Sequence, residues 1–257
     1  MQEVIQSVQI FALIIARVGA FMYQMPVLGA RYVPNITKIG LAAGISFAIY
    51  PIVAHVDVPS SGPFMEDFVL FVLKEMLVGI TVGLVVAIFI SGIRFTGRTI
   101  GMNMGLSMAN IVDPETGMDV SIVEEIIYLL FIFIFLVLNG HYFLIRAMVD
   151  SYSMVPLGGY SFHRDIILNM FSMLNQMLII GFTASMPVFG VLMINNVLLG
   201  IIAKVAQKIQ IILLSFPLKI GVGLLVLALI FPLMMESFMV TYDDITAGIY
   251  RILQAMY

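Results

Sequence analysis

Six long apolar stretches constrain the fold of this chain more than any other feature. A helix that crosses a membrane needs about 20 mainly apolar residues, and each stretch reaches or approaches that length. The stretches cover residues 6–28, 36–56, 68–92, 122–149, 170–202 and 209–235. No period-2 alternation of apolar and polar residues accompanies them, which argues against a β-barrel. The sequence therefore predicts an all-α, membrane-type protein with about six long apolar helices.

The composition excludes a soluble enzyme. Of the 257 residues 61% are hydrophobic and only 11% are charged, and the mean hydropathy is +1.11. Ordinary globular domains are about 45–50% apolar and about 25% charged. Such a small amount of polar surface cannot cover a soluble monomer, so lipid, partner subunits or both must cover the chain.

Motifs that carry enzyme chemistry are missing from the sequence. It has no cysteine, and its three histidines, at positions 55, 141 and 163, form no ligand-spaced pair. It also lacks a phosphate-binding loop, a His-Glu-x-x-His motif and a Gly-x-Ser-x-Gly elbow. No long basic run indicates nucleic acid binding. We therefore expect no catalytic residue, no cofactor and no metal ion, and any transport must be driven from outside the chain.

The connections and prolines indicate how the apolar stretches are organised. No segment is large enough for a separate soluble domain, so we expect one domain over residues 1–257 with an amphipathic tail over about 236–257. Proline removes a backbone donor, so Pro187, Pro217 and Pro232 predict kinks or breaks in the last two stretches. Basic residues cluster in the first, third and fifth connections, which by the positive-inside rule places both termini outside the cytoplasm.

Glycines spaced four residues apart mark candidate helix contacts. Two helix backbones approach closely where such glycines line one face, so packing replaces the hydrophobic drive that lipid removes. An isolated pair is also expected by chance, because glycine is frequent in apolar helices, but a tandem set favours real contacts. The glycines concerned are Gly40, Gly44, Gly79, Gly83, Gly97, Gly101 and Gly105.

Charged residues inside the apolar stretches need a reason to be there. A charge at bilayer depth costs roughly 2.5–3.5 kcal/mol on insertion scales. Arg146, Asp150 and Lys219 lie close enough to stretch ends for their side chains to reach the interface. Arg17 and Glu75 are deeper, so we expect them to face a polar interior or a subunit contact; the alternative is the transport site of a permease.

The segment that follows the third apolar stretch is too polar to span a membrane and too apolar for a simple solvated loop. It is rich in small residues and methionine, a flexible side chain that packs without one fixed fit. Such a composition suits a movable plug across an opening. The alternative is a buried re-entrant connection with no gating role. The methionines are Met102, Met104, Met108 and Met118.

Short fragments in a fixed order along the chain carry a family resemblance. They are Arg17-Val18-Gly19-Ala20 with Pro26 and Gly29, Val33-Pro34, Lys74-Glu75 with Gly79 and Gly83, Gly101 and Gly105 with Asp113-Pro114, Asn139-Gly140-His141, Ser151 with Pro156, and Phe216-Pro217-Leu218-Lys219. Over about residues 10–235 the chain thus resembles the FliR family of flagellar biosynthetic proteins and its injectisome counterpart in type III secretion. One departure is the 203–213 turn, which lacks the proline-containing run usual in that family.

The resemblance implies a non-catalytic pore subunit of the flagellar protein export gate in the bacterial inner membrane at the flagellar basal body. With FliP and FliQ it would form the channel for unfolded export substrates, with FlhB and FlhA nearby and membrane lipid around it. A loop over about 106–122 would plug the closed channel. The plug residues expected are Met102, Met104, Leu106, Met108, Asn110, Ile111, Asp113, Pro114 and Met118.

Residues expected to hold the helices together complete the predicted site. Besides the seven glycines above they are Arg17, Glu75, Asn139, Gly140, His141, Pro217 and Lys219. A secondary transporter for a small solute is the alternative function, since such proteins use midplane charges and proline-broken helices. No inverted repeat supports that alternative, and an intramembrane enzyme lacks any nucleophile–base or metal constellation.

Overall fold

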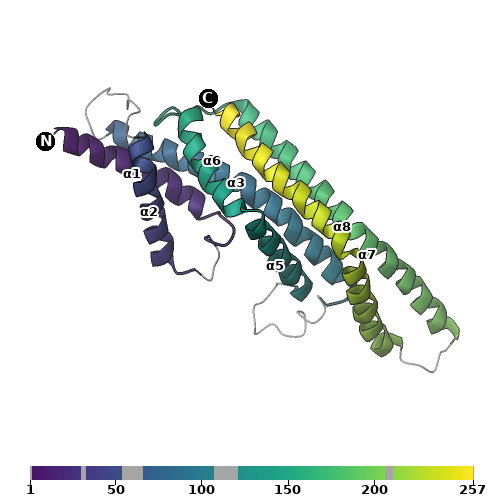
Figure 1. Ribbon diagram of the computed structural model, residues 1–257. Helices are drawn as coiled ribbons and strands as arrows, with labels where there is room; N and C mark the ends of the chain where they lie inside the picture. Colours follow the sequence, from purple (N-terminus) through teal and green to yellow (C-terminus); the bar gives the residue numbers. More distant parts are fainter. Residues whose placement is uncertain (1, 30–32, 54–65, 107–120, 206–210, 257) are drawn as a thin grey trace. The chain divides into compact units, whose positions relative to one another are not determined.

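The computed structural model describes residues 2–29, 33–53, 66–106, 121–205 and 211–256 (Figure 1). All regular secondary structure in these ranges is helical, which confirms the predicted all-α class. The helices are α1 (Gln2–Met22), α2 (Asn35–Val53), α3 (Glu66–Asn103), α5 (Ile122–Val137), α6 (Gly140–Met154), α7 (Arg164–Val205) and α8 (Ile211–Ala255). Five of them are long and apolar enough to cross a membrane, or six spans if α5 and α6 count as one bent span.

Two helices extend well beyond the apolar stretches that predicted them. α3 continues to Asn103 through the charged residues Arg94 and Arg98, and α8 continues to Ala255 through the predicted tail. Apolar composition marks what lipid or protein covers, whereas a helix ends only where its hydrogen-bond ladder stops. The buried residues of the last part of α8 recur every three or four positions, as on one face of a helix: Ile245, Ile249, Ile252, Leu253 and Met256.

The prolines do not break the helices. The sequence predicts kinks or breaks at these positions. α7 is continuous through Pro187, and α8 is continuous through Pro217 and Pro232, so no break occurs there, and kinks stay a prediction. A proline removes only one donor from the ladder, and apolar helices tolerate this where neighbouring groups satisfy the freed carbonyl.

A break occurs instead inside the fourth apolar stretch, at Asn139. Its backbone is left-handed, with φ 57° and ψ 31°, and its amide donates to the carbonyl of Leu136 at 3.0 Å. Asparagine is one of the few residues that adopt this conformation readily. Asn139 therefore ends one helix and begins the next, which divides the predicted stretch 122–149 into α5 and α6.

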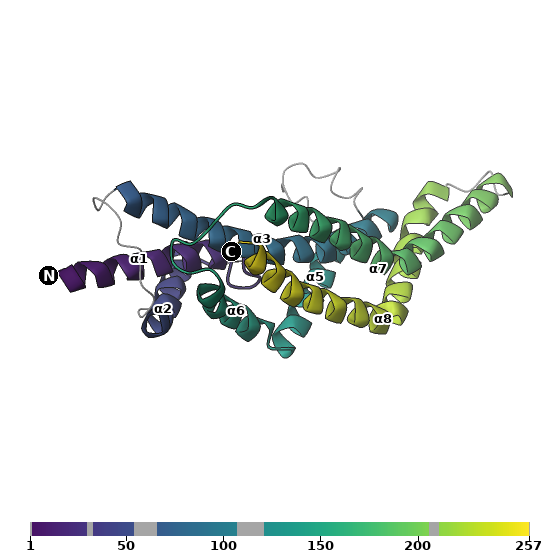
Figure 2. The same cartoon turned by 90° about the horizontal axis from the view of Figure 1, so that it is seen from above.

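The chain forms two compact units, and the long helices α3, α7 and α8 contribute to both. Unit 1 comprises Met1–Ile90, Leu136–Leu174 and Asp243–Tyr257. In it α1 lies along the N-terminal part of α3 (Figures 1 and 2), and α2 packs against α1. The Phe11 and Tyr50 rings meet edge to face in the α1–α2 contact, with centroids 6.1 Å apart.

Unit 2 comprises Ser91–Phe135 and Asn175–Tyr242. Its core contains an aromatic cluster in which the Phe131 ring meets those of Phe135 and Phe238 at centroid distances of 6.0 and 5.7 Å. α3 and α7 approach closely at Gly92 and Gly181, where a Cβ on Gly181 would lie 2.9 Å from the Gly92 carbonyl oxygen. The Thr96 hydroxyl donates to the Gly181 carbonyl at 3.1 Å and fixes this contact.

Candidate functional site

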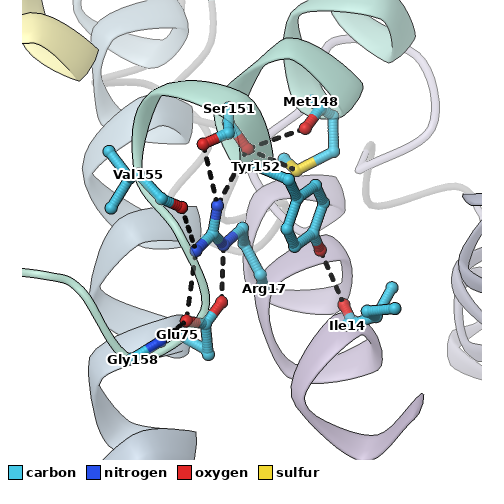
Figure 3. A network of polar contacts seen from close by, with 8 residues as sticks. All are labelled: Ile14, Arg17, Glu75, Met148, Ser151, Tyr152, Val155 and Gly158. Carbon is cyan, nitrogen blue, oxygen red and sulfur yellow. Dashed lines mark hydrogen bonds and ion pairs between the residues drawn. The ribbon is translucent and has the colours of Figure 1, made fainter. Parts of the chain in front are cut away.

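The most completely bonded polar group in unit 1 is the guanidinium of Arg17. It lies in the C-terminal half of α1 and is fully buried, as is Glu75 of α3. Arg17 Nε is 2.6 Å from Glu75 Oε2, and Arg17 Nη2 is 3.1 Å from Glu75 Oε1 (Figure 3). This two-pronged pairing is the strongest geometry that an arginine and a carboxylate adopt. The two deep charges that the sequence singles out are therefore each other's partners.

The remaining donors of Arg17 bond to α6 and to the loop that follows it. Nη1 donates to the carbonyl and hydroxyl oxygens of Ser151 at 3.1 and 3.2 Å, and Nη2 donates to the Val155 carbonyl at 3.0 Å. The Gly158 amide in turn donates to Glu75 Oε1 at 2.9 Å (Figure 3). Arg17 thus joins α1, α3, α6 and the 155–158 loop at one point.

Tyr152 closes the remaining side of this network. Its ring lies against the guanidinium, with the Arg17 Cζ atom 4.2 Å from the ring centroid, and its hydroxyl donates to the Ile14 carbonyl at 3.3 Å (Figure 3). A cation over an aromatic face is stabilised by the ring quadrupole, more so where water is excluded. We call Arg17, Glu75, Ser151, Tyr152 and Gly158 the Arg17 cluster.

Glycines permit the close approach that the Arg17 cluster needs. A Cβ on Gly79 would collide with the Arg17 carbonyl oxygen and lie 2.9 Å from Ala20 Cβ, and a Cβ on Gly83 would lie 2.9 Å from Gln24 Cβ. Gly158 has a positive φ of 73° and faces the Phe71 ring, so no other residue fits that turn without strain. The α1–α3 contact is therefore one that the predicted glycine face makes within this chain.

Gly79→Val is expected to destabilise unit 1, whereas Gly19→Ala is its matched control. Valine at position 79 would force α1 away from α3, and overpacking of this kind costs about 1–3 kcal/mol. A Cβ on Gly19 meets no atom within 4 Å, so alanine there should be neutral or slightly stabilising. The measurement is the temperature at which half of the purified, folded protein is lost on heating. Equal temperatures for the two variants would contradict the close α1–α3 contact.

Lys74 and the three charged residues that the sequence places near stretch ends are less buried than Arg17 and Glu75. Lys74 Nζ donates to the Gly158 carbonyl at 3.2 Å. Arg146 and Asp150 form an exposed pair 4.0 Å apart, and the Tyr250 hydroxyl donates to Asp150 at 2.8 Å. Lys219 is half-buried on α8. These positions agree with side chains near an interface rather than with a second buried network.

The predicted plug falls mostly outside the described residues. This applies to Met108, Asn110, Ile111, Asp113, Pro114 and Met118. Of the remainder, Met102 is exposed, Leu106 is half-buried, and Met104 is completely buried in unit 2 against Gly223 of α8.

Gly105 terminates α3 instead of extending its glycine face. It has a positive φ of 82°, its amide donates to the Met102 carbonyl at 3.0 Å, and the Leu106 amide donates to the Gly101 carbonyl at 3.1 Å. These two bonds form a Schellman motif, which usually has glycine at this position. The chain therefore leaves α3 through a firmly capped helix end.

The other predicted packing residues have different surroundings. Gly97 and Gly101 contact the beginning of α5, at Glu124 and Ser121, whereas a Cβ on Gly40 or Gly44 meets nothing within 4 Å. Beyond the break at Asn139, Gly140 is buried, and His141 and Pro217 are exposed.

Sequence reasoning missed Tyr152 and the functional use of Ser151 and Gly158. Ser151 had entered only as one fragment of the family resemblance. A group of three or more His, Cys, Asp or Glu side chains able to hold a metal is absent from the part of the chain that the structure describes. The hydrogen bonds of the Arg17 cluster join α1, α3, α6 and the 155–158 loop.

Comparisons with known proteins agree with the resemblance. The model of a family described as "Bacterial export proteins, family 1" matches residues 8–245. The chain is 32% identical over 218 residues to the flagellar biosynthetic protein FliR of Escherichia coli (strain K12), covering 84% of this chain and 82% of that protein. It is 30% identical over 233 residues to FliR of Bacillus subtilis (strain 168), covering 88% of each. The chain belongs to family 1 of the bacterial export proteins, the family of the flagellar biosynthetic protein FliR.

Proposed function

We propose that the chain is a non-catalytic wall subunit of the flagellar protein export gate, which with FliP and FliQ forms the channel for unfolded flagellar subunits. Family membership makes it a membrane component of the flagellar export apparatus. The finer proposal places it in the bacterial inner membrane at the basal body, with FlhB and FlhA nearby. The observation that supports the proposal is the large apolar helix surface that is not buried within the chain.

α7 exposes most of its apolar residues, and α8 exposes several in its first half. Within an 18-residue apolar window, only 22% of the residues of α7 and 17% of those of α8 are buried in the chain. Exposed side chains include Phe171 at 66%, Ile194 at 63% and Leu229 at 71%. Patches of this extent on an isolated chain are typical of contacts with other proteins or with lipid. A subunit whose long helices are covered by companion helices and lipid accounts for this surface.

α2 adds a face suited to helix packing. Gly40 and Gly44 lie on its exposed side with open space beyond them, unlike Gly79 and Gly83, which pack against α1. A small-residue face of this kind allows another helix to approach closely in a membrane. The proposal therefore includes a contact between this face of α2 and helices of other subunits.

The gating part of the proposal concerns residues 106–122. The described ends of this segment are firmly fixed: Met104 is buried, Gly105 caps α3, and Ser121 is buried at the start of α5. A segment held at both ends suits an order–disorder plug, which substrate would displace. Methionine side chains within it would adapt to different passing chains.

The Arg17 cluster argues against the alternative of a small-solute transporter. A transporter needs midplane polar groups that are free to bind substrate. Arg17 instead donates to Glu75, Ser151 and Val155, and Glu75 also accepts from Gly158. The deepest charges of the described residues therefore bind one another, which favours a structural role.

Co-purification tests the proposal. The tagged chain is expressed alone and together with FliP and FliQ, extracted in detergent, and analysed by size-exclusion chromatography and native mass spectrometry. We expect a defined complex of the three proteins in the second case and an aggregating chain in the first. A stable, monodisperse chain that takes no FliP or FliQ from the mixture would contradict the proposal.

A further inference from the structure

Pro187 removes a hydrogen-bond donor from the middle of α7. A proline has no backbone N–H, so the carbonyl of Thr183, four residues earlier, loses its usual helical donor. The hydroxyl closest to it in the sequence does not replace that donor, because Ser185 donates to the Phe182 carbonyl at 2.8 Å. The Thr183 carbonyl therefore needs a donor other than the one that a helix normally supplies.

Thr183 also presents its own hydroxyl at the same point. In other helices Thr81, Thr96 and Thr241 donate their hydroxyls to a carbonyl four residues back. Thr183 makes no such bond within the described part of the chain, and the residue is exposed. α7 thus offers a carbonyl and a hydroxyl side by side on an uncovered surface.

The surface that continues from Thr183 along α7 is apolar. Residues three or four apart in a helix share a face, and at this spacing Thr183 is followed by a glycine and three aliphatic residues. A Cβ on the glycine meets no atom within 4 Å, and the three aliphatic residues are each more than half exposed. We call these residues the Thr183 face: Thr183, Gly190, Ile194, Val197 and Ile201.

The described part of the chain does not cover the Thr183 face. At 3.6 residues per turn, Val188, Leu192 and Leu199 lie on the opposite side of α7. That side faces the chain, because these three residues are at most 5% exposed. The cover of the Thr183 face therefore comes from lipid, from water or from another protein.

The chemistry of the Thr183 face distinguishes among these three. Lipid suits the aliphatic side chains but offers no donor to the carbonyl and no acceptor to the hydroxyl. Water suits the two polar groups but leaves a contiguous aliphatic surface in contact with solvent. A helix of another subunit meets both needs, because it packs on the aliphatic residues, approaches closely at Gly190 and can carry a polar side chain.

The same arrangement of proline and exposed carbonyl recurs in two other helices. Pro51 frees the carbonyl of Phe47 in α2, and Pro232 frees that of Ala228 in α8. Both Phe47 and Ala228 are exposed. Freed carbonyls thus occur on faces that the described chain leaves uncovered, and only Thr183 adds a hydroxyl to one of these three.

We propose that the Thr183 face binds a helix of a companion subunit that carries serine, threonine, asparagine or glutamine opposite Thr183. Each of these side chains both donates and accepts hydrogen bonds. It donates to the Thr183 carbonyl and accepts from the Thr183 hydroxyl, so both groups are satisfied in a dry contact. This step rests on the proposed function, in which companion helices cover α7.

The lifetime of the co-expressed complex with FliP and FliQ tests the hydrogen bond. Thr183→Val keeps the shape of the side chain and removes its hydroxyl. It should shorten the half-life of the complex in detergent about three- to tenfold, the effect of one hydrogen bond between membrane helices. Thr183→Ser keeps the hydroxyl and should stay within about twofold of the wild type. A half-life equal to or longer than that of the wild type in Thr183→Val would overturn the proposal.

Photo-crosslinking identifies the occupant of the face. Benzoylphenylalanine replaces Met186, which is exposed and lies one turn from Thr183. We expect an adduct with a helix of FliP or FliQ, located by mass spectrometry within about one turn of one of the four polar residues. An adduct within the chain itself, or with a helix that lacks such a residue, would contradict the proposal.

A single cysteine tests for water at the same point. The chain has no cysteine, so Thr183→Cys reacts alone with a water-soluble maleimide in this subunit. Labelling should be about tenfold or more slower in the assembled complex than in the same complex after unfolding. Equal rates would place Thr183 in a water-filled space and would overturn the proposal.

The failure of this inference differs from the failure of the proposed function. If the wild-type chain forms no complex with FliP and FliQ, the proposed function fails, and this docking face fails with it. If the complex assembles but Met186 gives no adduct with either protein, the Thr183 face is wrong and the proposed function stands.

Discussion

Replacing Arg17 by alanine is expected to prevent recovery of the folded protein and its complexes. The fully buried Glu75 carboxylate would lose its only cation among the described residues, and Ser151 and Val155 would lose a donor. Breaking a buried ion pair from one side costs about 3–5 kcal/mol. That is a large share of the 5–15 kcal/mol typical of a domain. Glu75→Ala should have an equal effect, seen as lost yield in size-exclusion chromatography.

Three further variants define the origin of this loss. Arg17→Lys should recover only part of the yield, because one ammonium cannot bond both carboxylate oxygens and two carbonyls at once. The pair Arg17→Met with Glu75→Leu should also recover part, since no buried charge remains although the Ser151, Val155 and Gly158 backbone groups lose partners. Arg146→Ala, which removes an exposed pair with Asp150, should cost at most about 1 kcal/mol. Equal yields for Arg17→Ala and Arg146→Ala would contradict a structural role for the cluster.

The sequence predicted the helices well because apolar composition and helix formation coincide in a membrane-type protein. A backbone in lipid must satisfy its own hydrogen bonds, so a long apolar stretch has few alternatives to a helix. The ends of the helices were less predictable. Arg94 and Arg98 continue α3 beyond its apolar part, and Asn139 breaks a stretch that hydropathy marks as one segment. A left-handed residue differs from a helical one in its backbone dihedral angles, and hydropathy carries no information about them.

The Arg17 cluster could be predicted in part only. The cost of burying a charge identified Arg17 and Glu75 as residues that need partners. Their pairing joins positions 58 apart, and the bonds to Ser151 and Val155 join positions more than 130 apart. Such contacts follow from how α1, α3 and α6 pack, so local spacing contains no signal for them. Tyr152 likewise resembles any other tyrosine of an apolar helix.

Glycine spacing predicted close contacts without their partners. Gly79 and Gly83 pack against α1, Gly97 and Gly101 against the start of α5, and Gly105 caps α3. The same four-residue spacing thus serves two physical purposes, close approach and helix termination. Only the backbone conformation distinguishes them, because a capping glycine has a positive φ whereas a packing glycine stays helical.

Replacing residues 107–120 by a glycine–serine linker of equal length is expected to make membranes that contain the assembled gate permeable to small ions. If this segment plugs the channel, a hydrophilic linker lacks the methionine and other apolar side chains that would fill the opening. The chain ends of the replacement remain fixed by the Gly105 cap and by Ser121, so the helices themselves should be unaffected. Ion conductance should rise about tenfold or more above the wild-type complex, as expected for loss of an order–disorder closure.

A matched replacement isolates the plug from general damage. Residues 54–65, a connection that contains proline, serine and glycine, are exchanged for the same kind of linker, which should leave conductance at the wild-type level. Size-exclusion chromatography must show that both variants still assemble with FliP and FliQ. Background conductance in an assembled 107–120 variant would mean that this segment is a buried re-entrant connection instead of a plug. Raised conductance in both variants would assign the leak to a loosened assembly and not to loss of a plug.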